Sequence, residues 1–283
     1  MKKVWFRKGN QTFHNPVTER PASAFISYST EHESRCPTPI SAVQGRHYGD
    51  FRRQIWLLPS GCRGGNRSKG LHLYHWNMRA SAAIYETLHI VEIALRNTID
   101  EQFSIWNQTQ TNRTTGERRS AHWLLDPAPL LERIVRKDKI AEATERARKH
   151  IQRRRVSHRS GQTPEHCDIL AQLMFGTWRF ALKAPAGRRP DPGSALLWRD
   201  VLPNAFPNMT RTPRELVVDV TRIYEARNRI AHLEPMLDSQ QVQEVYDAVE
   251  RVLGDIGAFL PSWLRNQETI SEALAKHPLH PIP

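Results

Sequence analysis

The sequence predicts an all-α protein, because apolar residues recur at three- and four-residue spacing along several long runs and no convincing pair of strands is present. The longest run predicts a helix from about residue 72 to residue 106. Its buried face is expected to contain Tyr74, Trp76, Ile84, Leu88, Val91, Leu95 and Ile99. With 283 residues, 39% of them hydrophobic, the chain has enough apolar material for one sizeable domain with extensions.

The segment before this helix, residues 1–70, differs from the rest in composition. It is rich in Ser, Thr, Pro, Gly and Arg and has no sustained period, so we predict a largely disordered N-terminal extension. It holds 12 Lys or Arg against 4 Asp or Glu, whereas residues 71–283 hold 29 against 25. The formal charge of +12 therefore suggests a polyanionic partner, although the domain itself is only mildly basic.

A polar loop at residues 107–121 is expected to lead into two shorter helices, at 129–136 and 139–153. The second helix ends in a basic cluster, which consists of Lys149, Arg153, Arg154, Arg155 and Arg159. The simpler interpretation of this cluster is a solvated helix end, because a run of charge carries no geometry of its own. If RNA binds, this cluster is the expected contact to its phosphate backbone.

Two further helix starts are marked by a capping residue that precedes a proline. Thr163-Pro164 is expected to open a helix that reaches Leu182, in which Phe175 and Trp178 pack in the core rather than stack bases. Thr212-Pro213 is expected to open a helix that reaches about Leu233. The remaining expectations are a loop at 185–193, a short helix at 196–206, a last helix at 239–260 and a C-terminal tail at 263–283, where prolines prevent a regular finish.

The most informative run is Arg227-Asn228-Arg229-Ile230-Ala231-His232, at the end of the helix opened by Pro213. The apolar stripe of that helix includes Arg227, and an always-charged guanidinium there needs an anionic or polar partner, for which a phosphate is a natural candidate. Pro235 disfavours a helical Glu234, so His232 lies on the last turn, where a helix C-terminus favours positive charge. The plainer interpretation is a surface arrangement in which both side chains cap free carbonyls.

A second polar group lies beside the stripe of the long helix. Glu92 is next to that stripe and, if half-buried, needs a cationic or hydrogen-bonding partner. Arg96, four residues on, is one candidate, and Arg227 is another.

Five runs in this order resemble the Abi-like (abortive infection) branch of the HEPN superfamily. They are Leu73–Asn77, Glu92–Asn97, Leu173–Trp178, Ala205–Pro207 and Arg227–Pro235, and they lie in a domain that we place at residues 71–262. The resemblance implies a HEPN-like helical bundle, built on a four-helix core with extra peripheral helices. It also implies a homodimer that acts as a metal-independent endoribonuclease toxin in antiviral defence.

The same resemblance assigns residues and partners. The catalytic Arg and His of the family fall on Arg227 and His232, and Asn228 is the polar residue that follows the Arg. The family usually ends this motif with two His residues, whereas this chain has His232-Leu233. The partners implied are RNA, a second copy of the chain, and an antitoxin protein or regulatory RNA. Because the superfamily contains inactive members, a non-catalytic dimeric RNA-binding or adaptor module is the alternative.

The chemistry also follows from the residue types. Attack of a ribose 2'-hydroxyl on its phosphodiester needs a base, an acid for the departing 5'-oxygen and a cation for the phosphorane. An imidazole serves either proton role, and a guanidinium holds a phosphate through two parallel hydrogen bonds. One chain supplies one such pair, so a twofold dimer that joins two helix ends would supply two. In this scheme Asn228, Glu92 and Arg96 are supporting residues, and no metal or other cofactor is required.

Other site classes and compartments find less support. Cys36, Cys62 and Cys167 are odd in number and lack metal-finger spacing, which fits a reducing cytoplasm. Glu86-x-x-His89 matches half of a di-iron pattern, but no second copy is present. Neither a signal peptide nor an apolar run of membrane-spanning length is recognisable, so no membrane partner is expected.

Overall fold

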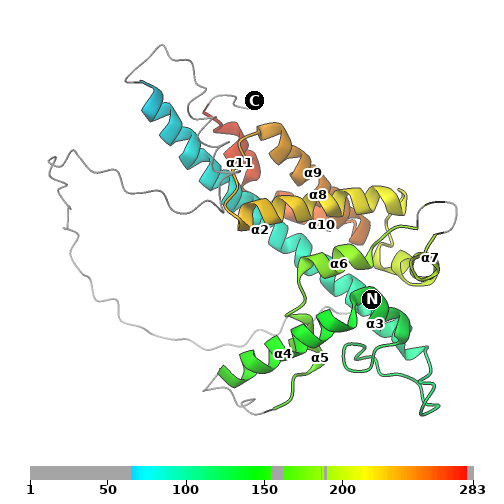
Figure 1. Ribbon diagram of the computed structural model, residues 1–283. Helices are drawn as coiled ribbons and strands as arrows, with labels where there is room; N and C mark the ends of the chain where they lie inside the picture. Colours follow the sequence, from blue (N-terminus) through cyan, green and yellow to red (C-terminus); the bar gives the residue numbers. More distant parts are fainter. Residues whose placement is uncertain (1–64, 154–161, 186, 188–189, 279–283) are drawn as a thin grey trace, which may run out of the picture. The chain divides into compact units, whose positions relative to one another are not determined.

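The computed structural model describes residues 65–153, 162–185, 187 and 190–278, and over these residues the protein is all-α (Figure 1). Within the described part, β pairing is limited to an isolated bridge between Thr111 and Arg118. The predicted all-α character is therefore confirmed over these residues. Most of the expected N-terminal extension lies outside the described residues, but residues 65–70 already belong to the first described helix, so the helical domain begins earlier than expected.

The first helix, α2 (Gly65–Gln108), extends alongside most of the other elements and packs against α9, α11, α8 and α6 (Figure 1). The stripe predicted from Ile84 to Ile99 is buried throughout. Tyr74 is an exception, with 46% of its surface exposed. Leu73 and Trp76 are buried on the same turn, and a residue between them falls off their common face.

Two helices follow the polar loop, as predicted: α3 (Pro129–Val135) and α4 (Lys137–Arg153). The loop is held by the buried side chain of Asn107, which donates to the carbonyls of Ser120 and Asp126 and accepts from the Ala128 amide. Arg136 separates the two helices with φ 73° and ψ 124°, a backbone region that side chains rarely adopt.

The prediction of a single helix at 163–182 is wrong, because the structure has two helices there: α5 (His166–Leu170) and α6 (Phe175–Ala181). The first starts later than Thr163-Pro164 because a capping box between Glu165 and Asp168 sets its N-terminus. The helix does not continue past Leu170, and the Gln172 carbonyl instead accepts a hydrogen bond from Arg146 at 3.0 Å. Phe175 and Trp178 are buried, which confirms their predicted packing role.

The next elements are α7 (Pro192–Asp200), the 3-10 helix η1 (Leu202–Ala205), α8 (Pro213–Ala231) and α9 (Ser239–Ile256). Helix α7 begins inside the expected 185–193 loop, because the Asp191 carboxylate caps the Ser194 amide and a proline takes the first turn. Helix α8 begins as predicted, with Thr212 and Glu215 in a capping box. It packs against both α9 and α6.

The segment expected as a tail contains two more helices, α10 (Leu260–Arg265) and α11 (Ile270–Ala275). The expectation of a tail is therefore wrong. These helices belong to the folded domain, because Leu264, Ile270 and Leu274 are all buried in the core. Helix α11 packs on α2, where the Trp76 indole donates to the Ala273 carbonyl at 2.7 Å. The last long helix correspondingly ends at Ile256 rather than at 260.

A charged network joins the start of α8 to α9. Asp219, only 3% exposed, accepts two hydrogen bonds from Arg251, at 2.8 and 2.9 Å, and a further one from Arg211. Arg211 also bonds Asp255 at 2.8 Å. Burial raises the pKa of Asp219, but the hydrogen bonds from Arg251 and Arg211 outweigh it and hold the pKa below its ordinary value.

We expect Asp219→Asn to lower the free energy of unfolding at pH 7 by about 2–3 kcal/mol, because it leaves the two arginines without their shared carboxylate. A depressed folded-state pKa stabilises the fold above the unfolded pKa, and this contribution is lost as pH falls through the folded value. The gap between wild type and variant should therefore shrink below about pH 4. Urea unfolding of both proteins at matched concentration, repeated across this pH range, measures the difference in the free energy of unfolding.

The control for this experiment is Asp200→Asn, which breaks an ion pair with Arg199 whose side chains are 74% and 40% exposed. We expect that change to leave the unfolding midpoint nearly unmoved, because exposed pairs contribute little. Equal losses in both variants would show that the Asp219 network has no special role.

Candidate functional site

The Arg227 side chain occupies an unusual position on α8. Its neighbours on the stripe, Ile223 and Ala226, are buried, and Arg227 itself is half-buried. Its Nε is fully covered and has no hydrogen-bond partner. The sequence predicted that Arg227 needs an anionic or polar partner. Because no ion pair to Arg227 is found among the described residues either, the fold leaves this cation uncompensated.

Arg227 lines a cavity of about 440 Å³. The cavity lies between the junction of α3 and α4, the break that precedes α6, and the C-terminal half of α8. Its cationic lining consists of Arg133, Arg136, Lys139, Arg146, Lys183 and Arg227. Its apolar and aromatic lining consists of Ile134, Val135, Leu173, Met174, Phe175, Phe180 and Tyr224.

Two carboxylates in the lining neutralise part of this charge. Asp191 pairs with Arg133 at 2.9 Å, and the hydrogen bond from Arg133 lowers the pKa of Asp191 to about 2, helped by the Ser194 amide. Glu142 lies 2.9 Å from Lys139 and 3.8 Å from Arg146. The cationic groups outnumber the anionic ones, so the cavity has an excess of positive charge.

Within the described part of the chain, Arg227 and Lys183 are the lining cations without an ion-pair partner. Asn228 also lines the cavity, and its side chain has no hydrogen bond to another described residue. A guanidinium, an ammonium and a carboxamide are thus available together for an anionic ligand.

His232 is the C-cap of α8; it is exposed and is not part of the cavity lining. Its backbone amide donates to the Asn228 carbonyl at 2.9 Å. The following turn places Leu233 at φ 57°, while the Glu234 amide returns to the Arg229 carbonyl at 2.8 Å. This is the Schellman arrangement that usually has glycine where Leu233 stands.

Arg229 is a residue beside the candidate site whose role sequence reasoning did not single out. Its guanidinium donates to the Pro235 carbonyl and to the Gln241 side chain, both at 2.6 Å, and lies 3.7 Å from Glu234. It therefore fixes the turn that presents His232. Two features of the sequence could have indicated this role: Arg229 lies within the Arg227–His232 run, and Glu234 follows it closely.

The expected partners of Glu92 are not found. Glu92 is half-buried, as anticipated, but no ion pair joins it to Arg96 or Arg227 in the described part of the chain. Arg96 instead hydrogen-bonds Asn97 at 3.2 Å. The structure therefore does not bring Glu92 and Arg96 together with the cavity residues.

Some of the runs singled out in the sequence contact residues that lie close to another run. Asn77 on α2 accepts a hydrogen bond from the Met236 amide at 2.7 Å, directly after the Arg227–Pro235 run. Thr98 on α2 donates to the Ala205 carbonyl at 3.0 Å. The ring of Phe175 lies edge-on to that of Tyr224 on α8, with centroids 6.1 Å apart.

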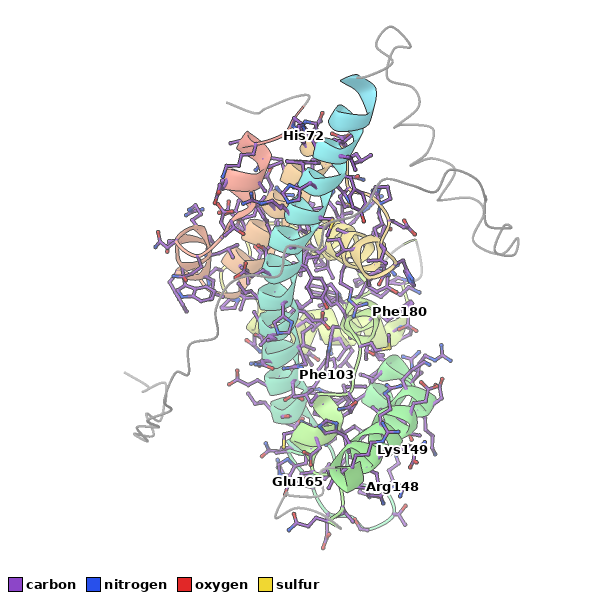
Figure 2. The ribbon with its side chains drawn as sticks, turned by 90° about the vertical axis from the view of Figure 1, so that its left-hand side faces the viewer. His72, Phe103, Arg148, Lys149, Glu165 and Phe180 are labelled. Atoms are coloured by element: carbon purple, nitrogen blue, oxygen red, sulfur yellow. The ribbon has the colours of Figure 1, made fainter. Side chains whose placement is uncertain are left out.

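The basic cluster at the end of α4 is described only in part. Lys149 and Arg153 are exposed, and Lys149 lies 3.5 Å from Glu145 (Figure 2). Arg154, Arg155 and Arg159 lie outside the described residues. From α4 the cavity lining takes Lys139, Glu142 and Arg146, and neither Lys149 nor Arg153 belongs to it.

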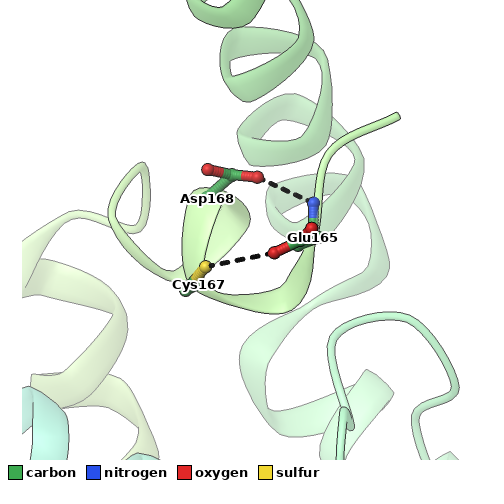
Figure 3. A group of neighbouring side chains, drawn as sticks. All are labelled: Glu165, Cys167 and Asp168. Atoms are coloured by element: carbon green, nitrogen blue, oxygen red, sulfur yellow. Dashed lines mark hydrogen bonds between the residues drawn. The ribbon is translucent and has the colours of Figure 1, made fainter. Parts of the chain in front are cut away.

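One group of potential metal ligands occurs in the described part of the chain: Glu165, Cys167 and Asp168 (Figure 3). The Asp168 carboxylate accepts from the Glu165 amide at 2.8 Å, so capping of α5 already explains it. Cys167 is a free, exposed thiol. Glu86 and His89, the half-matched di-iron pair, are both exposed on α2.

Among the described helices, none combines the length and apolar character needed to span a membrane. No protein-family model, curated protein or solved structure matches this chain.

Proposed function

We propose that this protein is a metal-independent endoribonuclease of the HEPN type, an abortive-infection toxin that works as a homodimer. Arg227 stabilises the phosphorane and His232 transfers protons. The observation that supports this most is the uncompensated guanidinium of Arg227 in a cationic cavity, on the helix end that also presents an exposed His232. In this assignment the four-helix core consists of α2, α8 and α9, which pack on one another, and α6, which packs on α2 and α8.

A phosphate is the partner that best fits Arg227. Burial of an unpaired cation is unfavourable, and a phosphate relieves that cost through charge-assisted hydrogen bonds. Lys183 and Asn228 line the same cavity and add donors for further oxygens. The cavity therefore supports binding of a phosphodiester at Arg227.

The placement of His232 supports a dimer. Five residues along an α-helix correspond to roughly 140° of rotation, so Arg227 and His232 point to different sides of α8. Only Arg227 lines the cavity, so one chain does not offer both groups to one linkage. In a twofold dimer, His232 of a second copy would reach the phosphate held by Arg227 of the first.

The chemistry then needs no other group. The His232 imidazole of the second copy takes the proton of the ribose 2'-hydroxyl and then, as an imidazolium, gives a proton to the departing 5'-oxygen. The guanidinium stabilises the charge that develops on the phosphorane. The products would be a 2',3'-cyclic phosphate and a 5'-hydroxyl.

We expect the purified chain to cut total cellular RNA, to leave 2',3'-cyclic phosphate ends and to keep its rate in EDTA. Sequencing libraries that require a cyclic phosphate for ligation would identify the ends. A rate that collapses with EDTA and returns with added Mg²⁺ would replace this mechanism with a metal-dependent one.

A non-catalytic RNA-binding or adaptor module is the second candidate. It is favoured by one observation, the absence of His232 from the cavity lining. Such a module would bind single-stranded RNA, with salt-dependent affinity, and would generate no new ends. The same incubation therefore separates the two functions.

A further inference from the structure

We propose that the cavity beside Arg227 holds one nucleotide, with its phosphate on Arg227 and Lys183 and its base against the apolar wall. This extends the proposed function through a shared residue, Arg227, but it does not require cleavage. The ligand class is a phosphorylated nucleoside, either free or as one unit of an RNA strand.

The size of the cavity is the first support. At about 440 Å³ it is within the roughly 300–1,000 Å³ typical of pockets that enclose a small molecule. A bare phosphate would fill only a small part of it. The rest of the space needs a further chemical group on the ligand.

The aromatic side chains that line the cavity indicate that this further group is a base. Phe180 on α6 (Figure 2) lines the cavity although 61% of its surface is exposed. Tyr224 lines it from α8. The Arg179 guanidinium lies 5.3 Å from the Phe180 ring centroid and 4.9 Å from that of Tyr224. Aromatic rings with stacked guanidinium planes are the surfaces on which proteins stack unpaired bases.

Gly176 helps to shape this wall. A Cβ at this position would lie 3.4 Å from Cε2 of Tyr224, an ordinary contact distance, so alanine would fit here but a longer side chain would meet the ring. The small residue therefore keeps the space beside the Tyr224 ring clear of a bulkier side chain from α6.

Strain at Arg136 is the second support. Arg136 lines the cavity with φ 73° and ψ 124°, a positive-φ conformation that costs glycine less than residues with a Cβ. The fold keeps an arginine there, and its guanidinium is paired with Asp138 at 2.9 Å. In the proposed complex a ligand phosphate takes the place of that carboxylate.

The experiment measures binding of 5'-AMP, inorganic phosphate and a 2'-O-methyl oligoribonucleotide to the full chain by calorimetry. We expect 5'-AMP to bind at least tenfold more tightly than phosphate. Phe180→Ala should weaken 5'-AMP about tenfold and leave phosphate unchanged, because it removes a stacking surface. Lys183→Ala should weaken both ligands by a similar factor.

Phe259→Ala is the matched control, because Phe259 is 68% exposed and lies outside the cavity lining. It should leave both affinities unchanged. Displacement of 5'-AMP by the oligoribonucleotide identifies the ligand as a unit of RNA, and independent binding of the two identifies a free nucleotide. Equal affinities for phosphate and 5'-AMP, or no saturable binding of 5'-AMP, would overturn the proposal.

Arg136→Gly gives a second, independent signature. We expect the unfolding midpoint to rise, because strain is removed, and the affinity for 5'-AMP to fall by about tenfold. Leu233→Gly relieves the other strained position, at φ 57°, and should raise the midpoint without changing affinity. A stable Arg136→Gly variant with wild-type affinity would contradict the proposal.

The outcomes also separate this proposal from the proposed function. Nucleotide binding without RNA cleavage would keep the cavity assignment and reject the nuclease. Cleavage that is unaffected by Phe180→Ala, with no 5'-AMP binding, would keep the nuclease and reject the nucleotide cavity.

Discussion

Replacing His232 with alanine is expected to slow RNA cleavage by about 10²–10⁴-fold, the usual contribution of one positioned proton-transfer group. The side chain is exposed at the end of α8 and does not line the cavity, so its removal should alter neither the fold nor the affinity for RNA. Single-turnover cleavage of a labelled single-stranded RNA, together with binding to a 2'-O-methyl analogue of the same sequence, measures the two quantities separately.

His89→Ala is the matched control, because it removes another exposed imidazole, from α2. It should cleave at the wild-type rate. If His232→Ala cleaves as fast as His89→Ala, His232 transfers no proton in the reaction, and the proposed mechanism is wrong.

The local signals in the sequence were sufficient for most of the fold. The Thr212-Pro213 start of α8 follows from one capping residue and one proline, and the buried stripe of α2 follows from spacing alone. Such features are set by neighbours within a few residues. The α8 stripe likewise indicated that Arg227 would need an anionic or polar partner, although it did not indicate that Glu92 would fail to supply one.

The cavity was not predictable from the sequence, because it depends on a break between two helices where the sequence indicates one. An apolar stripe from Ile169 to Leu182 indicates a continuous helix, but the chain breaks before Phe175 and residues of this break line the cavity. The break is stabilised from another element, through Arg146 and the Gln172 carbonyl. A long-range hydrogen bond of this kind leaves no periodic signal.

The C-terminal helices were missed for a related reason. Helices α10 and α11 are only six residues long each, too short for a periodic pattern, and they are stabilised by burial of Leu264 and Leu274 against distant elements. The relation of His232 to Arg227 was equally hidden. It depends on the turn after α8, which Arg229 fixes through the Pro235 carbonyl.

Arg227→Met should have opposite effects on stability and activity. Methionine keeps much of the side-chain volume and removes an uncompensated charge, so we expect the free energy of unfolding to rise by about 1–2 kcal/mol. Cleavage should fall by about 10²–10³-fold, because the phosphorane loses its cation. Arg227→Lys should recover part of the affinity for RNA but little of the rate, since an ammonium lacks the forked geometry.

Arg211→Met is the matched control, because Arg211 is also largely buried but is paired with Asp219 and Asp255. That change should destabilise the fold, since it leaves two carboxylates with fewer partners. Urea unfolding of both variants tests the contrast in sign. A clear loss of stability in Arg227→Met would show that Arg227 has a partner within the protein and is not held ready for a ligand.

Mixing Arg227→Met with His232→Ala chains tests the dimer directly. Random exchange makes about half of the dimers mixed, and each mixed dimer has one intact Arg227 and one intact His232, on different chains. If the pair acts across the dimer axis, activity should reappear after mixing although both parent variants are inactive. If the pair acted within one chain, mixed dimers would stay inactive, because neither chain has both groups. Recovery that requires subunit exchange would therefore connect the cavity residue Arg227 to the exposed His232 of the other copy.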